Sequence, residues 1–219
     1  MGSMTNARDV WIVGATGLVG REAVLALLEA AQFERVLSLV RRPSGQTSPK
    51  LDERVVDFEA LSAALSAEHA DVAICCLGST IKQAGSQEQF RHIDFDYALT
   101  FARQAQAAGA RHFLVVTALG ANASSRVFYN RVKGELERAL TGLGFEALTI
   151  VRPSLLIGDR GKQSRLGERL AAPLMSLLPK SVRGIEAKKV GRALARLAAD
   201  ESAKGRRVVP SAELHSLGA

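Results

Sequence analysis

The stretch from Val10 to Gly20, VWIVGATGLVG, places an apolar run, a glycine-rich turn and a helix-forming run in direct succession. Glycine at positions 14 and 17 allows a sharp turn and a close approach of the backbone to a ligand. Gly20 allows the helix to pack tightly on the strand. Free N–H groups at the start of such a helix bind anions. The order therefore indicates a strand, turn and helix that hold a pyrophosphate, and a tight turn without a ligand is the alternative.

Strand and helix patterns alternate along most of the chain. Strands are predicted at 10–14, 35–40, 54–57, 72–77, 112–117 and 147–152. Helices are predicted at 18–31, 59–67, 87–108 and 129–141. Continuous apolar strands that alternate with amphipathic helices are typical of a parallel sheet covered on both faces. We therefore expect an α/β fold with a Rossmann-type doubly wound parallel sheet.

The pattern changes after residue 157. Glycine and proline interrupt the helical runs of 158–186, and a helix at 187–199 and a short strand at 206–209 follow. About sixty residues with interrupted patterns make a poor core alone. We therefore expect residues 4–157 to form the nucleotide-binding core and 158–219 to form a small C-terminal substrate cap and closing elements of the same domain.

Composition limits the function classes. A chain of 219 residues fits one large domain, and its net charge of +7 comes from scattered basic residues. Aromatic residues make up only 5% of the chain, so no stacking platform for nucleic acid is visible. No apolar run approaches the roughly 20 residues that span a bilayer. Cys75 and Cys76 are adjacent, so on a strand they point to opposite faces and cannot pair. We expect a cytoplasmic protein with no nucleic-acid or membrane partner.

The second predicted strand ends in Arg41 and Arg42, where an acidic residue would bind the 2′-hydroxyl of an NAD ribose. The arginine fork is permanently charged and binds phosphate at two points. The position therefore favours a 2′-phosphate and the cofactor NADP(H). A solvated arginine pair is the alternative interpretation.

Tyr129 and Lys133 are four residues apart and share one face of a predicted helix. A phenol has a reference pKa of about 10, and a neighbouring ammonium lowers it, which makes such a pair a sensible proton donor. An ordinary amphipathic helix start is the alternative. His92 and Asp94 lie on a helical stretch without a second ligand at metal spacing, so we expect a solvated or capping role and no metal site.

Five motifs occur in the order and spacing of one superfamily. They are GATGLVG near the start, LGST after the fourth strand, VVTALGA at the fifth, YNRVK on the next helix and VRPSLL after the sixth. With them the chain resembles the short-chain dehydrogenase/reductase (SDR) superfamily in its extended or atypical branch. Within that branch it is most similar to the NAD(P)H-binding group that contains the Tat-interacting protein TIP30 and its bacterial relatives.

The resemblance implies a role for each matching residue. The pyrophosphate turn would comprise Gly14, Thr16, Gly17, Leu18, Val19 and Gly20. Arg41 and Arg42 would hold the 2′-phosphate, and Asp57 and Phe58 would lie near the adenine. The ribose and diphosphate would be bordered by Leu77, Gly78 and Ser79, and the nicotinamide by Pro153, Ser154 and Leu155. Lys133 would contact the nicotinamide ribose and tune Tyr129, the catalytic acid.

The fifth strand departs from the superfamily pattern. Many of these reductases carry a hydroxyl residue as the second of the pair that here reads Thr117-Ala118. Thr117 can supply the hydroxyl from the neighbouring position, although side chains alternate along a strand. We expect an NADPH-dependent oxidoreductase that reduces a small carbonyl compound, acts as a monomer or homodimer, and uses Tyr129, Lys133 and Thr117. An NADP(H)-binding regulatory module with little or no turnover is the alternative.

Overall fold

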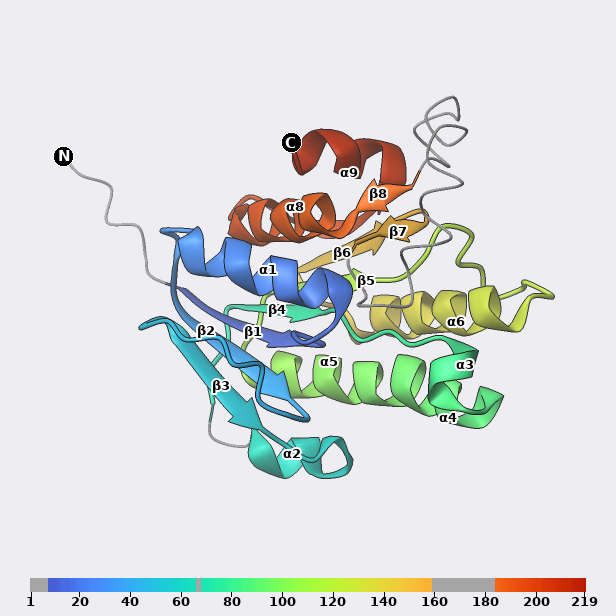
Figure 1. The fold of residues 1–219 in the computed structure, drawn as a ribbon, viewed down its shortest axis with the longest axis horizontal. Coiled ribbons are helices and arrows are strands. Elements are labelled where there is room, and N and C mark those ends of the chain that lie inside the picture. Colours follow the sequence, from blue (N-terminus) through green and yellow to red (C-terminus); the bar gives the residue numbers. More distant parts are fainter. Residues whose placement is uncertain (1–7, 66–67, 159–183) are drawn as a thin grey trace.

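A computed structural model describes residues 8–65, 68–158 and 184–219. Its main sheet has seven parallel strands in the order β3-β2-β1-β4-β5-β6-β9 (Figure 1). The strands are β1 (Arg8–Val13), β2 (Phe33–Val40), β3 (Leu51–Val55), β4 (Val72–Cys75), β5 (His112–Val116), β6 (Ala147–Arg152) and β9 (Gly205–Pro210). A separate short pair consists of β7 (Leu156–Ile157) and β8 (Ile185–Glu186).

Helices cover both faces of the sheet (Figure 1). One face carries α1 (Leu18–Glu29) and α8 (Ala187–Ala199), and α9 (Ser211–Leu217) packs on α8. The other face carries α5 (Ala98–Ala107) and α6 (Phe128–Leu143). Shorter elements are the 3-10 turn η1 (Phe58–Ala60), α2 (Leu61–Ala64), α3 (Ile81–Ala84), α4 (Gln87–Arg91) and the π-turn η2 (His92–Tyr97). This architecture confirms the predicted Rossmann-type fold.

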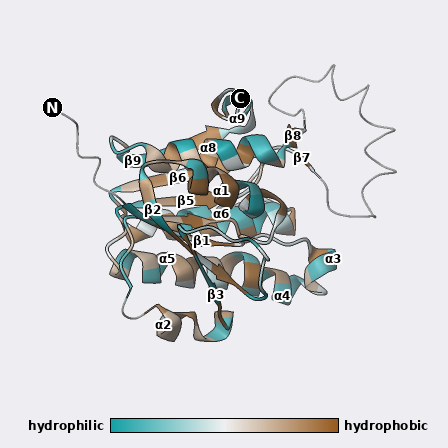
Figure 2. Cartoon of the chain, turned by 60° about the vertical axis from the view of Figure 1, so that its left-hand side comes forward, coloured by the Kyte–Doolittle hydropathy of each residue, from teal (hydrophilic) through white to brown (hydrophobic). Residues whose placement is uncertain are grey.

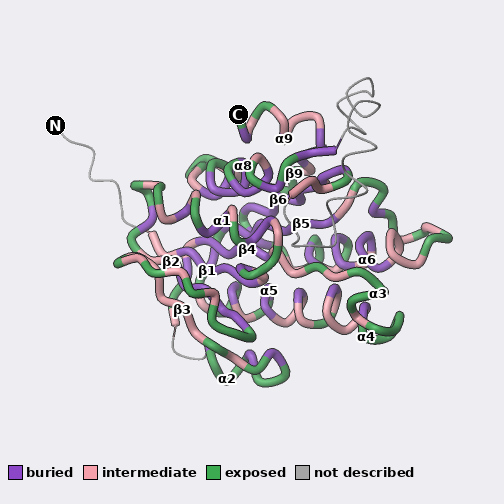
Figure 3. The backbone as a smooth tube through the Cα atoms, in the orientation of Figure 1, coloured by how far each residue is buried: buried purple, intermediate pink, exposed green. Residues whose placement is uncertain are grey.

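The central strands are buried on both faces, which explains their continuous apolar sequences. On β1, Val10 and Ile12 pack with the α1 and α8 side, whereas Trp11 and Val13 pack with the α5 side. Figure 2 shows the hydrophobic residues gathered along the sheet, and Figure 3 shows that the buried residues follow the same strands.

The predicted elements are largely present, with two differences. β3 begins at Leu51 rather than at 54, because its charged residues are held in ion pairs: Asp52 pairs with Arg35 of β2 and with Arg54 of β3 itself. The helical stretch predicted at 87–108 is present at 87–107, but it is not one regular α-helix, since the π-turn η2 stands between α4 and α5. A π-turn widens the helix by one residue per turn and changes which side chains face inward.

The C-terminal elements complete the main sheet. β9 pairs with β6, and α8 packs so closely on α1 that a Cβ on Gly191 would lie 2.6 Å from the backbone N of Ala23. Of the predicted cap and closing elements at 158–219, residues 159–183 lie outside the described residues. The substrate cap therefore stays a prediction.

The strand order reverses at β1, whose neighbours are β2 on one side and β4 on the other. The loops that follow two such strands run in opposite directions, and a crevice forms between these loops at the carboxyl ends of the strands. The glycine-rich turn and the start of α1 lie at this crevice. It is the position at which open α/β sheets bind ligands.

Candidate functional site

The glycine-rich turn requires its glycines. Gly14 has φ of +78°, and a Cβ there would lie 2.5 Å from the carbonyl carbon of Cys76. A Cβ on Gly20 would lie 2.0 Å from the Gly14 oxygen, so no larger residue allows α1 to meet the turn this closely. The N–H of Gly17 donates to the same oxygen at 3.0 Å. The close packing predicted for Gly20 is thus present.

The first turn of α1 is open to an anion. Gly17 is the N-cap residue, no side chain caps the helix, and the first turn holds no acidic residue. The N–H groups of the first helical turn have no partner within the helix, and the helix dipole adds positive potential there. Backbone and dipole together fit a phosphate group.

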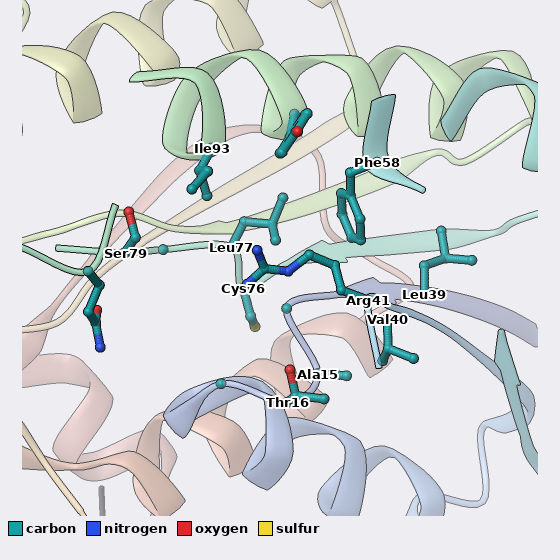
Figure 4. Close-up of a pocket in the computed structure, with 15 residues that line it drawn as sticks. Ala15, Thr16, Leu39, Val40, Arg41, Phe58, Cys76, Leu77, Ser79 and Ile93 are labelled. Carbon is teal, nitrogen blue, oxygen red and sulfur yellow. The ribbon is translucent and has the colours of Figure 1, made fainter. Parts of the chain in front are cut away.

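A cavity of about 360 Å³ lies against this turn (Figure 4). Figure 4 shows the Arg41 side chain, which follows β2, and the Phe58 ring, which belongs to η1, directed into it. The Phe58 ring also packs against Tyr97, with the ring centroids 5.5 Å apart. The lining residues comprise the turn Gly14–Gly17, the β2 end Leu39–Arg41, the β4 end Cys76–Ser79, and Phe58, Gln83, Ile93 and Tyr97.

A second cavity of about 290 Å³ continues from the first. The two share six lining residues, namely Gly17, Cys76, Leu77, Gly78, Ser79 and Gln83. The second cavity is also lined by Leu18, Val19, Thr80, Val116, Thr117, Tyr129, Lys133 and Leu156. One cleft therefore runs from Arg41 at one end to Tyr129 and Lys133 at the other, past the start of α1. We call these the arginine end and the tyrosine end.

Lys133 is a buried charge at the tyrosine end. Its Nζ lies 2.7 Å from Oδ1 of Asp94, with side-chain exposures of 2% and 0%. Burial alone lowers the pKa of Lys133, but the Asp94 carboxylate, aided by Tyr129, outweighs burial and raises it. Lys133 is therefore an ammonium held in place. The solvated or capping role predicted for Asp94 is wrong, because the π-turn η2 directs this side chain into the interior.

Tyr129 is partly exposed at the same end of the cleft, near the start of α6. Its ring packs on the ring of Phe90, with the centroids 5.4 Å apart. The structure thus brings Tyr129, Lys133 and Thr117 together along one cavity, as the sequence predicts.

Thr117 makes a hydrogen bond that the sequence does not reveal. Its Oγ1 donates to Oε1 of Glu137 at 2.7 Å, and Glu137 is held in turn by the Arg152 guanidinium. The hydroxyl proton of Thr117 therefore serves Glu137, and only its lone pairs are left for a ligand. Ala118 supplies no hydroxyl in its place.

Some predicted site residues lie outside the lining of both cavities. Asp57 caps η1 by accepting from the Glu59 N–H, and Arg42 is exposed. Pro153 and Ser154 are buried, and Leu155 is 65% exposed. Leu156, which follows these three, lines the tyrosine end instead. The contacts predicted for these residues remain predictions.

Sequence reasoning missed several lining residues. They are Gln83, Ile93, Tyr97 and Leu156, in addition to the buried Asp94. Ile93, Asp94 and Tyr97 all belong to η2, and helical periodicity gives no sign of a π-turn. Asp94 is the buried residue of η2, while its neighbours in the turn are half-buried or exposed, so the surrounding sequence gave no signal that this carboxylate needs a cationic partner.

A profile of the NAD(P)H-binding family matches residues 14–201. The chain belongs to this family. It is 36% identical to the protein HTATIP2 of Rattus norvegicus over 178 residues, which cover 80% of this chain and 73% of that protein. It is 35% identical to the mitochondrial protein FMP52 of Eremothecium gossypii over 217 residues, 94% of this chain and 95% of that protein. The resemblance stated from the sequence is confirmed.

Solved structures share the fold at low sequence identity. MoeE5 in complex with UDP-glucose and NAD has a TM-score of 0.70 and 17% identity, with 96% of this chain and 80% of that chain covered. The oxidoreductase ylbE from Lactococcus lactis has a TM-score of 0.66 and 16% identity, with 95% and 96% covered. These likenesses confirm the Rossmann-type fold. Among the described helices, none combines the length and apolar character that crossing a bilayer requires.

Proposed function

We propose that this member of the NAD(P)H-binding family is an NADPH-dependent oxidoreductase that reduces a small carbonyl compound. The observation that carries the proposal is the continuous cleft, which has Arg41 at one end and the Tyr129 and Lys133 pair at the other. The uncapped start of α1 stands between them, where the two phosphates of a dinucleotide would lie.

NADP(H) fits the cleft better than NAD(H). Arg41 lines the arginine end, and no acidic side chain is among the described residues that line either cavity. An NAD site needs an acceptor for the 2′-hydroxyl, whereas a 2′-phosphate needs a cation. Phe58 and Tyr97 offer ring faces to the adenine at the same end.

Bound NADPH supplies a hydride for the carbonyl carbon, and the protein supplies the proton. In this proposal Tyr129 Oη donates its proton to the carbonyl oxygen, which yields the alcohol and leaves a phenolate. The Lys133 ammonium at the same end stabilises that phenolate through its charge. Lys133 would also hold the nicotinamide ribose of the bound cofactor, since it lines the same cavity. Because the Thr117 proton serves Glu137, Tyr129 is the proton donor at this end, and Thr117 acts at most as an acceptor.

One observation favours the alternative, an NADP(H)-binding regulatory module with little or no turnover. The usual hydroxyl that orients a substrate carbonyl is absent at Ala118, and the Thr117 hydroxyl is engaged. Such a module would bind cofactor with the same groups and report its redox state to a partner. Fold alone does not separate the two functions.

Two measurements test the proposal. Fluorescence titration is expected to show tighter binding of NADPH than of NADH. A panel of small aldehydes and ketones is then screened for NADPH oxidation by the parent protein and by Tyr129→Phe. Turnover that falls by roughly 10²–10⁴ in Tyr129→Phe, with NADPH affinity kept, supports the proton donor. NADPH binding without turnover on any compound favours the module, and absence of NADPH binding contradicts both functions.

Cellular context remains a proposal. We propose that the protein is cytoplasmic, because Cys75 and Cys76 are free thiols, as expected in a reducing compartment. We also propose that it is a monomer or homodimer. The fungal relative is mitochondrial by name. Cell fractionation tests the location, and recovery of the protein in mitochondria would contradict it. Size-exclusion chromatography with light scattering tests the oligomeric state, for which a tetramer or larger assembly would contradict the expectation.

A further inference from the structure

Asp94 joins three parts of the chain at the tyrosine end of the cleft. Its Oδ1 lies 2.7 Å from Nζ of Lys133 on α6. Its Oδ2 accepts hydrogen bonds from Ser79, from the backbone N–H at 2.9 Å and from Oγ at 2.6 Å. Ser79 lies between β4 and α3 and lines both cavities. One fully buried carboxylate therefore fixes a lysine and a serine that both line the cleft.

We propose that Asp94 is a positioning residue. It keeps Lys133 charged and fixed, and it takes the hydroxyl hydrogen of Ser79, so that Ser79 Oγ acts as an acceptor towards a ligand. The inference rests on the proposed function, because it concerns how this end recognises the nicotinamide half of the cofactor. Asp94 acts through its two neighbours and touches no reacting atom.

The charge balance around Lys133 depends on Asp94. The groups that face the ammonium are Asp94 on η2, Tyr129 on α6 and Cys75 on β4. Cys75 is neutral at ordinary pH, since burial raises the pKa of its thiol to about 11. Among the described residues, Asp94 is then the carboxylate that compensates the buried ammonium. Without it, burial would drive Lys133 towards its neutral form.

Asp94 also determines which ligand groups this end accepts. The Ser79 hydroxyl donates its hydrogen to Asp94, so its lone pairs are left to accept a hydrogen bond from a ligand. Lys133 keeps ammonium hydrogens that can be donated. A pair that both accepts and donates matches the hydroxyl groups of a sugar, whereas phosphate oxygens only accept. The tyrosine end therefore fits a ribose, and the uncapped start of α1 fits the phosphates.

The π-turn explains how one segment serves both ends of the cleft. Within η2, Asp94 is fully buried, while Ile93 and Tyr97 line the arginine end and Asp96 is exposed. Asp96 pairs with His92 on the surface. The Asp96→Asn variant removes the same charge from the same turn without touching Lys133. It is therefore the matched control for Asp94→Asn.

Binding of NADPH is measured by fluorescence from pH 6 to pH 9.5 in the parent, Asp94→Asn and Asp96→Asn, with 2′,5′-ADP as a probe of the arginine end. Asp94→Asn is expected to weaken NADPH binding by about tenfold or more, the worth of a charge-assisted hydrogen bond. The loss of affinity in Asp94→Asn is expected to grow as pH rises, because Lys133 loses its proton at a lower pH in this variant than in the parent. Binding of 2′,5′-ADP is expected to stay unchanged, which a general loss of structure would not allow. Equal NADPH affinity in Asp94→Asn and Asp96→Asn would overturn the proposal.

Thermal unfolding gives a test without cofactor. At pH 7, Asp94→Asn is expected to melt below both the parent and the double variant Asp94→Asn, Lys133→Met, because it alone buries an unpaired charge. The unfolded chain keeps the Lys133 proton up to about pH 10.5. The folded Asp94→Asn protein is expected to release this proton at a lower pH, because the buried ammonium has lost its carboxylate partner. Its Tm therefore rises towards that of the double variant between pH 7 and pH 10.

An equal Tm for Asp94→Asn and the double variant at pH 7 would show that Asp94 does not hold a buried charge, and would overturn the proposal. If the parent binds neither NADPH nor 2′,5′-ADP, the proposed function fails, and the unfolding comparison alone decides the role of Asp94. If Asp94→Asn does not fold while the double variant does, the buried charge is established by that difference.

Discussion

The Nζ atom of Lys133 lies 2.7 Å from Oδ1 of Asp94, and both side chains are almost completely buried. The two residues come from different elements, η2 and α6, on the α5 side of the sheet. A buried ion pair adds little net stability, because desolvation opposes the attraction of the charges. The ion pair instead serves to position a group, since it holds the Lys133 ammonium beside Tyr129 at the tyrosine end of the cleft.

Arg41 rather than Arg42 is expected to select the cofactor. Arg41 lines the arginine end, and Arg42 lies outside the lining of both cavities. Arg41→Ala should weaken NADPH binding by about tenfold to a hundredfold through loss of a charge-assisted phosphate contact, and leave NADH binding nearly unchanged. Titrations of Arg42→Ala give the matched control, for which a small effect is expected. A larger loss in Arg42→Ala than in Arg41→Ala would reverse this assignment.

Thr117 is expected to matter for stability more than for catalysis. Thr117→Val removes the hydrogen bond to the Glu137 carboxylate and should lower the free energy of unfolding by about 1.5–3 kcal/mol. Turnover, once a substrate is found, should change by less than about tenfold, below the range of a lost acid or base. Thr141→Val is the control, since Thr141 bonds the Glu137 carbonyl from the exposed side of α6. A hundredfold loss of turnover in Thr117→Val alone would give Thr117 a catalytic role.

Gly20, at the start of α1, and Gly142, in α6, should change the stability of the fold in opposite directions when each is replaced by alanine. Gly20→Ala forces a Cβ to 2.0 Å from the Gly14 oxygen and should destabilise the fold by at least about 1–3 kcal/mol. Gly142 is exposed in α6 with open space around it, so Gly142→Ala should stabilise by about 0.5 kcal/mol. Urea unfolding of both variants measures the difference. A neutral effect of Gly20→Ala would contradict the close packing of α1 on the turn.

His112 should make folding stability depend on pH. Burial, with a smaller effect of Arg8, lowers the pKa of this imidazole to about 4 against the opposing effect of Asp200. The unfolded chain takes up the proton below about pH 6.5, whereas the folded protein does not, so stability is complete above pH 6.5 and falls as pH drops towards 4. The free energy of unfolding should decrease by about 2 kcal/mol between pH 7 and pH 5. His112→Gln should lose most of this dependence, and an identical pH profile in both proteins would refute the assignment.

The sequence predicted the parts of the site that depend on the local backbone. Gly14, Gly17 and Gly20 define a turn through conformational freedom and close approach, and these are properties of the residues themselves. The strands of the centre were found because burial on both faces leaves continuous apolar runs. The start of the edge strand β3 was predicted three residues too late. Its charged side chains, which pair with Arg35 and Glu68, hide the apolar pattern of a strand.

The parts that were missed depend on tertiary partners. Asp94 looks like a surface residue in a helical pattern, and only the packing of η2 against α6 shows its pairing with Lys133. The Thr117 hydroxyl is directed by Glu137, which lies twenty residues further along the chain. The helix α9 was not predicted, and its fit depends on Gly218, where a Cβ would lie 2.1 Å from the Lys189 oxygen.

The central claim is that NADP(H) lies along the cleft with its adenosine half at Arg41 and its nicotinamide at Tyr129. A crystal structure of the protein with NADPH tests this claim most directly. We predict electron density for the 2′-phosphate against Arg41, the diphosphate at the start of α1, the ribose hydroxyls at Lys133 and the nicotinamide ring beside Tyr129. Density in the reverse orientation, or a nucleotide bound elsewhere on the protein, would contradict the account.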